Sequence, residues 1–232
     1  VVVPILSFTP LLLGYEWQPE ILFAIILFFS ISLLDDFKKI PAIIRLGFHF
    51  ATITFIILTY DNIGKLLNEF YSDFPVVILY IFLILFLIWF VNLFNFMDGI
   101  DGITGIETII IGLGVSIIHY NIDGTYNMYS ISLIGVAIGF LIHNLSSKRI
   151  FLGDCGSIPL GFICGIILVD LIFKGYWVSA IILPAYYLSD SSITLFTRLL
   201  KRKKVWQAHN EHYYQKAVRR GLSHKKVSFL VA

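Results

Sequence analysis

The sequence predicts an all-α fold, a polytopic integral membrane helical bundle, on the strength of three observations. Of its 232 residues, 58% are hydrophobic and only 14% are charged. Its mean hydropathy of +0.86 is far above that of an ordinary soluble domain. The apolar residues also gather into separate runs of about 20 residues, the length of helix that crosses the hydrocarbon layer of a bilayer.

Seven of these runs have spanning or nearly spanning length. They are residues 20–34, 43–60, 75–91, 103–119, 129–145, 157–173 and 177–197. Polar or turn-forming residues mark several of their ends. Asp35-Asp36 closes the first run, Pro41 stands where the second helix can begin, and Ser157 can cap the sixth.

Two shorter apolar segments lie outside the seven runs. Residues 1–13 resemble the end of an earlier span and residues 226–232 the start of a later one, and the chain opens at Val1 instead of a methionine. We therefore expect about seven complete spans with partial spans at both ends. We also expect residues 1–232 to be a single integral-membrane domain, a fragment truncated at both ends.

The basic residues predict how the spans are oriented. Alternating spans divide the loops into two sets, and all but two of the 17 Lys and Arg residues fall in one set. Only Lys65 and Lys174 fall in the other, so the positive-inside rule places the first set in the cytoplasm. Because these basic residues are scattered over several short loops, we expect the bilayer to be their partner and no nucleic acid. Cys155 and Cys164 suggest no disulfide framework.

Four polar clusters fall in the same, cytoplasmic set of loops. They are Asp35-Asp36 and residues 92–105, 151–157 and 209–215. The opposite loops carry little beyond turn-forming residues. Four separate polar clusters on one membrane face are a far less probable accident than any one of them alone, so we expect a functional site at the cytoplasmic surface.

The stretch "NLFNFMDGIDGITG" is the longest of these clusters. Asn92, Asn95, Asp98 and Asp101 recur at every third residue, which predicts that neighbours share a helical face. The glycines that follow let the backbone turn or approach a ligand closely. A single pair of this kind would be a hydrated helix end. For the whole run near membrane depth a functional role is favoured.

Two clusters contribute carboxylates. Asp35 and Asp36 are adjacent and repel each other unless a cation, from the neighbouring lysines or a divalent ion, relieves them. Mg²⁺ suits such a place, because it takes one or two carboxylates together with phosphate oxygens and water. In "FLGDCGS", Asp154 lies between two glycines and Phe151 offers an aromatic face. Taken alone, these residues would equally fit a solvated helix end, an N-cap turn and a lipid-interface ring.

The last cluster, "HNEHYYQ", places His209 and His212 three residues apart on a short amphipathic helix. It differs from the HExxH zinc pattern, so a zinc site is disfavoured. Residues 201–204 immediately upstream are all basic. A cationic lid over anionic phosphates and a basic helix lying on the lipid surface both remain open interpretations.

Together the four motifs resemble the polyprenyl-phosphate N-acetylhexosamine-1-phosphate transferases, the bacterial glycosyltransferase family 4. They are "SLLDDFKKI", "NLFNFMDGIDGITG", "FLGDCGS" and "HNEHYYQ", in the family's order. The resemblance covers almost the whole chain. The "YYQ" after the histidines looks most like the branch that initiates O-antigen synthesis, and it leaves the donor sugar open.

This resemblance implies an activity and partners. The reaction would transfer an N-acetylhexosamine 1-phosphate from a UDP-sugar to undecaprenyl phosphate, with release of UMP. The enzyme would be a multi-pass protein of the bacterial inner membrane with its active site in the cytoplasm and with Mg²⁺, or Mn²⁺ in its place, as cofactor. A homodimer is a further expectation.

The resemblance also implies residue roles. Asp154 would be the main metal ligand, with Asp36 beside the metal and Asp35 positioning or accepting a proton near the lipid phosphate. His209 and His212 would meet the diphosphate or the sugar. The remaining candidates would line the nucleotide-sugar site, with an aromatic ring stacking on uracil: Asn92, Asn95, Asp98, Asp101 and Phe151.

A cation or proton transporter is the alternative from another functional class. Its carriers would be the intramembrane acids Glu107 and Asp190. Transporters bind their substrates near the middle of the bilayer, often at broken helices. The polar clusters gather at one surface instead, which favours the transferase.

Overall fold

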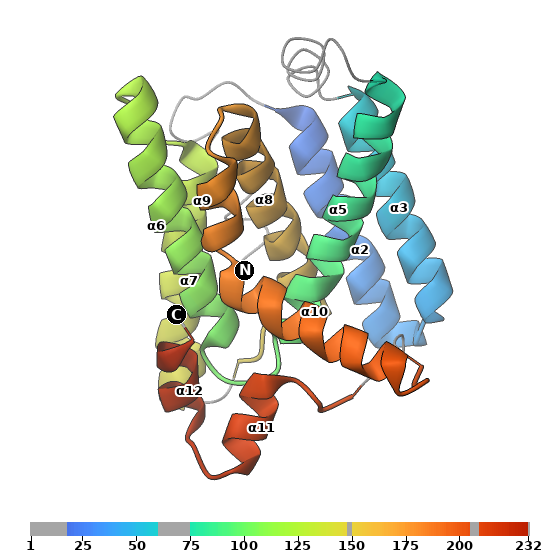
Figure 1. Cartoon of the computed structure of the whole chain (residues 1–232), viewed down its shortest axis with the longest axis vertical. Coiled ribbons are helices and arrows are strands. Elements are labelled where there is room, and N and C mark those ends of the chain that lie inside the picture. The colour runs from blue at the N-terminus through green and yellow to red at the C-terminus, as the bar shows by residue number, and fades with distance from the viewer. Residues whose placement is uncertain (1–17, 60–74, 148–149, 205–208, 232) are drawn as a thin grey trace.

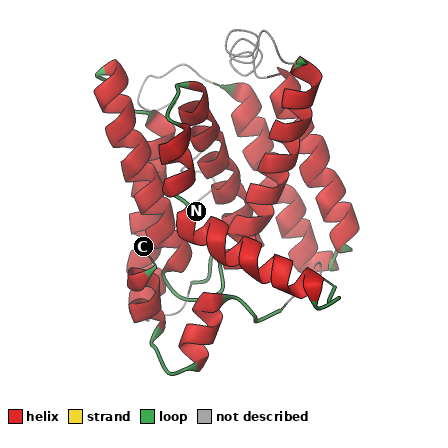
Figure 2. Cartoon of the chain, viewed as in Figure 1, coloured by secondary structure: helices red, strands yellow, loops and turns green. Residues whose placement is uncertain are grey.

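The structure is a computed structural model that describes residues 18–59, 75–147, 150–204 and 209–231. Within these ranges all regular secondary structure is helical (Figure 2). The helices are α2 (Pro19–Lys38), α3 (Ala42–Thr59), α5 (Val76–Met97), α6 (Ile103–Asp123), α7 (Met128–Ser147), α8 (Asp154–Phe173), α9 (Trp177–Ile182), α10 (Ala185–Leu200), α11 (Tyr213–Arg219) and α12 (His224–Leu230). The all-α prediction is confirmed.

Five of these helices, α3, α5, α6, α7 and α8, are long and apolar enough to cross a membrane. Helix α2 has a similar length of 20 residues and begins at Pro19, but it carries charged residues near both ends. These helices run side by side as one bundle (Figure 1), so the chain is a polytopic membrane helical bundle, as predicted. The partial span expected at residues 1–13 lies outside the described residues.

The continuous span predicted over residues 177–197 is wrong. The segment forms the short helix α9 and the longer helix α10, separated by Leu183 and Pro184. Proline has no backbone N–H and its ring clashes with the preceding turn, so a helix breaks there. Helix α10 then runs obliquely across the lower end of the bundle (Figure 1).

Helix α10 has two contrasting faces. Its exposed side chains include Ile193, Phe196 and Leu199. Its buried side chains include Asp190 and Arg198. A helix that exposes apolar groups and buries charged ones suits a lipid surrounding, with its polar face directed at protein partners.

Helix α8 forms the centre of the bundle, and nearly all of its side chains beyond the first turn are buried. It packs against α2, α5, α6, α7 and α9. Small residues allow the closest of these approaches. A Cβ atom added at Gly161 would lie 2.7 Å from Cβ of Phe94, and one at Gly165 would lie 2.8 Å from Leu87. Such close helix contacts are typical of membrane bundles.

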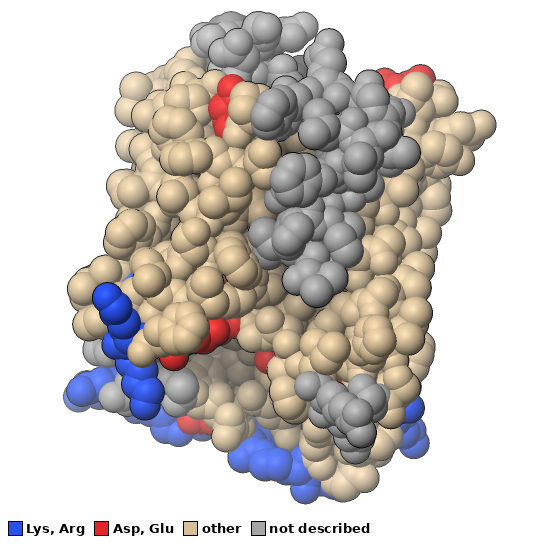
Figure 3. Space-filling view, turned by 180° about the vertical axis from the view of Figure 1, so that it is seen from behind, with Lys and Arg blue, Asp and Glu red and all other residues tan. Residues whose placement is uncertain are grey.

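The two ends of the bundle differ in charge. Figure 3 shows Lys and Arg side chains gathered along the lower end, with Asp and Glu atoms beside a hollow just above them. Helices α11 and α12 lie at this end (Figure 1). Helix α12 packs on α6 and ends at Leu230. It overlaps residues 226–232, where we expected the start of a later span.

Candidate active site

Carboxylates from separate segments meet around one guanidinium group at the lower end of the bundle. Nη1 of Arg45, on α3, lies 2.6 Å from Oδ2 of Asp35 and 2.8 Å from Oδ2 of Asp154. Asp35 lies in the last turn of α2, whereas Asp154 is the first residue of α8. Two predicted motifs that are more than 100 residues apart therefore meet at a single positive charge.

Asp35 is held by its own helix terminus as well as by Arg45. Helix α2 ends with Lys39 in the left-handed region, and the N–H of Lys39 bonds to the carbonyl of Asp35. The next N–H, of Ile40, donates to Oδ1 of Asp35 at 2.6 Å. Both carboxylate oxygens of Asp35 thus have partners, which fixes the direction in which this acid points.

Asp154 is oriented by α5. Nδ2 of Asn95 donates to Oδ1 of Asp154 at 2.8 Å and to Oγ of Ser157 at 2.9 Å. Ser157 in turn donates to the carbonyl of Gly153. Asn95 was predicted to touch substrate, but the structure places it against the acid of the "FLGDCGS" motif.

Asp36 lies near Asp154, because Sγ of Cys155, the residue after Asp154, approaches Oδ2 of Asp36 at 3.5 Å. It is exposed, so its carboxylate is the more open of the pair. Among the described residues, no group of three or more His, Cys, Asp or Glu side chains is arranged to hold a metal ion. Because Mg²⁺ takes only one or two protein carboxylates, Asp154 and Asp36, which the contact of Cys155 brings near each other, are the described residues that could hold such an ion.

The spacing of "NLFNFMDGIDGITG" predicted one helical face, and the structure corrects this. Helix α5 continues past the predicted end at residue 91 but stops at Met97, so Asp98 and Asp101 lie in the following loop. Nδ2 of Asn92 donates to the carbonyl of Ile88 in its own helix. No contact described for Asn92 brings it to the site.

Asp98 accepts a hydrogen bond of 2.7 Å from the Thr104 hydroxyl, which in turn accepts one from Tyr187. Burial raises the pKa of Asp98 from its usual 3.8 to about 6, against the opposing effect of Thr104 and together with the nearby charge of Asp154. An acid with such a raised pKa is typical of a functional cleft.

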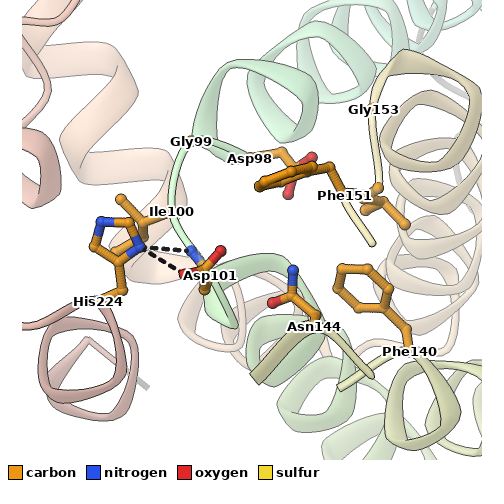
Figure 4. A pocket seen from close by; sticks show the side chains of 10 residues that line it. Asp98, Gly99, Ile100, Asp101, Phe140, Asn144, Phe151, Gly153 and His224 are labelled. Atoms are coloured by element: carbon orange, nitrogen blue, oxygen red, sulfur yellow. Dashed lines mark hydrogen bonds and ion pairs between the residues drawn. The ribbon is translucent and has the colours of Figure 1, made fainter. Parts of the chain in front are cut away.

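A cavity of about 210 Å³ opens beside Asp98 (Figure 4). Its lining comes from two loops and two helices: Asp98, Gly99, Ile100, Asp101, Phe140, Asn144, Phe151, Leu152, Gly153 and His224. The rings of Phe140 and Phe151 border one side, and the polar groups of Asp101, Asn144 and His224 border the other. Phe151 is 75% exposed, so its ring is free to meet a flat ligand.

The polar side of this cavity is tied together by hydrogen bonds. Oδ1 of Asn144 accepts from the N–H of Gly102 at 2.7 Å, and its Nδ2 donates to the carbonyl of Ile150. Asp101 lies with Oδ2 at 2.9 Å from Nδ1 of His224, an interaction drawn in Figure 4. The cavity is thus braced by α7 and α12 as well as by the predicted motifs.

The histidine loop, residues 209–219, lies below α10. The rings of His209, His212 and Tyr214 form a continuous stack, with centroid separations of 4.8 and 5.7 Å. Oη of Tyr214 donates to the carbonyl of Phe96, at the end of α5. A side chain at Gly99 would overlap this tyrosine ring, so a glycine is required where the two motifs meet.

His209 and His212 differ in their surroundings. His212 is 2% exposed and forms the N-terminal cap of α11. His209 is only partly buried, and its Nδ1 accepts from the N–H of Glu211. Burial, together with the nearby His212 and Arg198, lowers the pKa of His209 to about 4. His209 is therefore a neutral side chain near pH 7, with its Nε2–H as donor.

A second cavity of about 330 Å³ lies between α5, α8, α9 and α10 and is almost wholly apolar. Its lining residues are Leu79, Phe82, Leu83, Phe86, Val169, Ile172, Phe173, Trp177, Ala180, Ile181, Pro184 and Leu188. The break at Pro184 stands on its wall. This cavity was not predicted, because the sequence shows one continuous apolar run over residues 177–197.

Three polar residues of the site were missed from the sequence. Arg45 was counted only as a residue that orients the spans, and Asn144 and His224 lie outside the four motifs. Only Arg45 carried a usable signal, since it stands at the start of the span that follows the acid pair Asp35-Asp36. The other two are brought in by tertiary packing alone.

Residues 19–172, more than half of the chain, match a known family described as glycosyl transferase family 4. The chain belongs to glycosyl transferase family 4. The family match contains three of the four predicted motifs and ends at α8, before α9 and the histidine loop. Family membership, as inferred from the motifs, is confirmed.

Two curated relatives of this family 4 chain are similar over shorter stretches. One is the probable undecaprenyl-phosphate N-acetylglucosaminyl 1-phosphate transferase of Bacillus subtilis, 27% identical over 122 residues, which are 50% of this chain and 34% of the relative. The other is the phospho-N-acetylmuramoyl-pentapeptide-transferase of Streptococcus mutans, 29% identical over 197 residues, which are 79% of this chain and 57% of the relative. In both cases the matched part is well short of the relative's full length.

Proposed function

We propose that this protein transfers an N-acetylhexosamine 1-phosphate from a UDP-sugar to undecaprenyl phosphate, giving undecaprenyl-diphosphate-sugar and UMP. The reaction would take place at the cytoplasmic face of a bacterial inner membrane and would initiate O-antigen or another cell-envelope polysaccharide. The names of both relatives describe transfer of this chemical kind. The gathering of basic residues at the end that bears the site supports the cytoplasmic orientation (Figure 3).

One observation carries the proposal: an acid cluster built around a cation lies at the same end of the bundle as the aromatic-sided cavity. Asp35 and Asp154 meet at Arg45, and Gly153, the residue before Asp154, lines the same cavity as Asp98. A sugar nucleotide requires both features, a place for its base and a place where its phosphate charge is neutralised.

The cavity of about 210 Å³ suits the nucleoside half of the donor. Phe151 offers a ring on which uracil can stack. The amide of Asn144 and the carboxylate of Asp101 supply polar groups at the edge. This assignment keeps Phe151, Asp98 and Asp101 as proposed substrate contacts, whereas Asn95 becomes a residue that orients Asp154.

The apolar cavity suits the isoprenoid chain of the acceptor. It lies between membrane helices, and its wall is formed by aliphatic and aromatic side chains. The groove ends near Leu188, one turn from the buried acid that contacts the histidine loop. An acceptor lying there would have its tail among apolar side chains and its phosphate directed toward the polar end.

Asp154 and Asp36 would hold Mg²⁺, or Mn²⁺ in its place. When bound, this ion would neutralise the diphosphate oxygens and stabilise the charge that develops on the departing UMP. Arg45 supplies a second positive charge that keeps Asp35 and Asp154 from repelling the anionic substrates. His209, neutral near pH 7, would donate from Nε2 to the diphosphate or to the sugar.

The bond changes are those of a phosphoryl transfer. An acceptor phosphate oxygen attacks the β-phosphorus of the donor, and a new P–O bond forms. The bond from this phosphorus to the bridging oxygen breaks, and its electron pair leaves with UMP. Because a phosphate monoester has a second pKa of about 6, the acceptor is largely ionised at neutral pH. Asp35 therefore acts mainly by position, held by Ile40 and Arg45.

The transporter alternative loses one of its two carriers. Asp190 accepts hydrogen bonds from five groups and has no open face. Glu107 is buried within α6, at the same end of the bundle. A single buried acid gives no path across the bilayer, so transfer at one surface is the better supported function.

Incubation with undecaprenyl phosphate, Mg²⁺ and a panel of labelled UDP-N-acetylhexosamines tests the proposal. We expect the label to become lipid-extractable and UMP to appear in equal amount, with a clear preference for one donor. The Asp154→Asn variant serves as the inactive control. Absence of lipid-linked product with every donor, from protein that is folded in a detergent melting assay, would refute the proposal.

A further inference from the structure

Asp190, on α10, binds the histidine loop that lies below this helix. Its Oδ1 lies 3.1 Å from Nδ1 of His212 and accepts the N–H of Tyr213 at 3.0 Å. Its Oδ2 accepts the N–H of Tyr214 at 3.2 Å. Asp190 and His212 are 3% and 2% exposed, so water does not compete for these bonds. Three contacts from one carboxylate therefore fix the start of α11.

Two further bonds orient the carboxylate itself within α10. The hydroxyls of Tyr186 and Thr194, one turn before and one turn after, each donate to Asp190 at 3.1 Å. A carboxylate that accepts five hydrogen bonds stays ionised and has a single allowed orientation. Because an ionised carboxylate is only an acceptor, His212 must carry its proton on Nδ1 to bond to it.

Basic residues at the end of α10 and just after it contact the loop at a second point, the acid Glu211. Nη1 of Arg198 lies 2.6 Å from Oε1 of Glu211, and Nζ of Lys203 lies 2.9 Å from the same oxygen. The loop is thus held on both sides of its turn, by an acid at His212 and by bases at Glu211. The ring of His209 stacks on that of His212, next to both contact points.

We propose that Asp190 is a positioning residue for the transfer reaction: by fixing the proton of His212 on Nδ1 and pinning the start of α11, it presents His209 to the phosphates of the donor. This inference rests on the proposed function. His212 is then a fixed support for the ring of His209, and it does not touch substrate. The sequence had assigned equal roles to the two histidines.

The contacts of Asp190 with His212, Tyr213 and Tyr214, here called the Asp190 clamp, also connect the histidine loop to the nucleotide cavity. Tyr214, whose N–H is held by Asp190, reaches the carbonyl of Phe96 and packs against Gly99, a residue that lines the cavity. Loss of the clamp would therefore misplace His209 relative to the donor without removing any group that binds the base. The expected result is a fall in kcat with a smaller change in KM for the UDP-sugar.

Asp190→Asn is the test, because it keeps the shape of the side chain and removes its charge. We expect kcat to fall about 100-fold with less than a fivefold change in KM, because His209 would be misplaced relative to the donor phosphates. Asp190→Glu should recover part of the loss. Thr194→Val, which removes one bond to the same carboxylate and none to the loop, should stay within about threefold of the parent.

Two measurements separate a positioning role from a general structural one. In ¹⁵N-histidine NMR, His212 of the parent should carry its proton on Nδ1, and Asp190→Asn should change this tautomer. Amide hydrogen exchange should rise in residues 209–219 of Asp190→Asn and stay unchanged in α6 and α8. Asp170→Asn, the same chemical change at the opposite end of the bundle, is the matched control.

The outcomes decide between the two proposals. If the parent protein forms no product with any donor, the proposed function fails, and an unchanged tautomer with unchanged exchange in Asp190→Asn then overturns the clamp as well. If the parent is active and Asp190→Asn keeps its kcat within threefold, the clamp is overturned while the transferase stands. Loss of kcat with the altered tautomer supports both.

Discussion

The two ends of this bundle each hold a cluster of acids and bases, and they differ in how completely the charges are paired. At the upper end, His119 of α6 lies 2.9 Å from Asp170 of α8, and Lys174 lies 2.6 Å from Asp123. The first contact is an ion-pair approach without the alignment of a hydrogen bond. Each acid of this cluster has a basic partner, and the cavity lined by its chain neighbours Val169 and Phe173 is almost wholly apolar.

Among the described residues around Arg45 and the polar cavity, the acids outnumber their basic partners. Asp35 and Asp154 share the single nitrogen of Arg45, Asp36 meets only a thiol, and Asp98 has a hydroxyl as its partner. This surplus of negative charge adjoins a cavity. The contrast separates a charge cluster that joins helices from one arranged to receive a cation and a ligand. Four predictions test it.

Asp154→Asn should have the largest effect. We expect transfer activity to fall by about 10³-fold or more, because the change removes the proposed metal ligand that Asn95 and Arg45 orient. The melting temperature in detergent should change little, since the amide keeps one acceptor for Asn95. Radiolabel transfer and differential scanning fluorimetry measure the two quantities. A strong loss of stability with retained activity would place Asp154 with the structural cluster.

Arg45→Ala should reduce activity by about 100-fold, because Asp35 and Asp154 would then face the anionic substrates without their shared positive charge. Arg45→Lys should recover much of this loss. Both acids meet a single nitrogen of the arginine, so a lysine ammonium can serve them in part. Steady-state kinetics on the three proteins measure the effect. Equal activity of Arg45→Ala and the parent would show that the site does not use this charge.

Asp170→Asn should act on stability and leave catalysis alone. Loss of the partly exposed pair with His119 costs about 1 kcal/mol, which corresponds to a melting temperature lower by about 2–4 °C. We expect kcat and KM to remain within twofold of the parent. A clear loss of activity in folded Asp170→Asn would erase the distinction between the two ends.

Asp98→Asn should give the smallest effect, and one that depends on pH. The folded protein holds the proton of Asp98 up to a pKa of about 6, against 3.8 for the free side chain. Folded protein therefore binds more protons than unfolded chain between these values, and the parent loses stability as the pH rises through them. The variant should melt above the parent at pH 7 and equal to it near pH 4. A difference independent of pH would contradict this.

Much of the fold could be predicted because run length and loop charge reflect simple physics. Apolar runs of spanning length located α2, α3, α5, α6, α7 and α8, and alternation of spans placed the four motifs at one end. The break at Pro184 escaped prediction because a proline within an apolar run is tolerated in membrane helices. The apolar groove beside it was missed for the same reason.

The candidate site was predicted less fully, because spacing reports local geometry and not the packing of distant segments. A repeat of three residues suggested one face for Asn92 and Asp101, but α5 ends between them. Arg45, Asn144 and His224 join the site only through tertiary contacts. Asp190 was predicted only as a carrier of the transporter alternative, because its partners in the histidine loop follow it by more than twenty residues.

Binding of Mn²⁺, followed by electron paramagnetic resonance in the presence of UDP, tests the central claim most directly. That claim is that Asp154 and Asp36 at the lower end receive a divalent cation together with the donor phosphates. The parent protein and Asp170→Asn should each bind one ion per chain, and Asp154→Asn should bind none in the same range of concentration. Equal binding by Asp154→Asn and the parent would contradict the account.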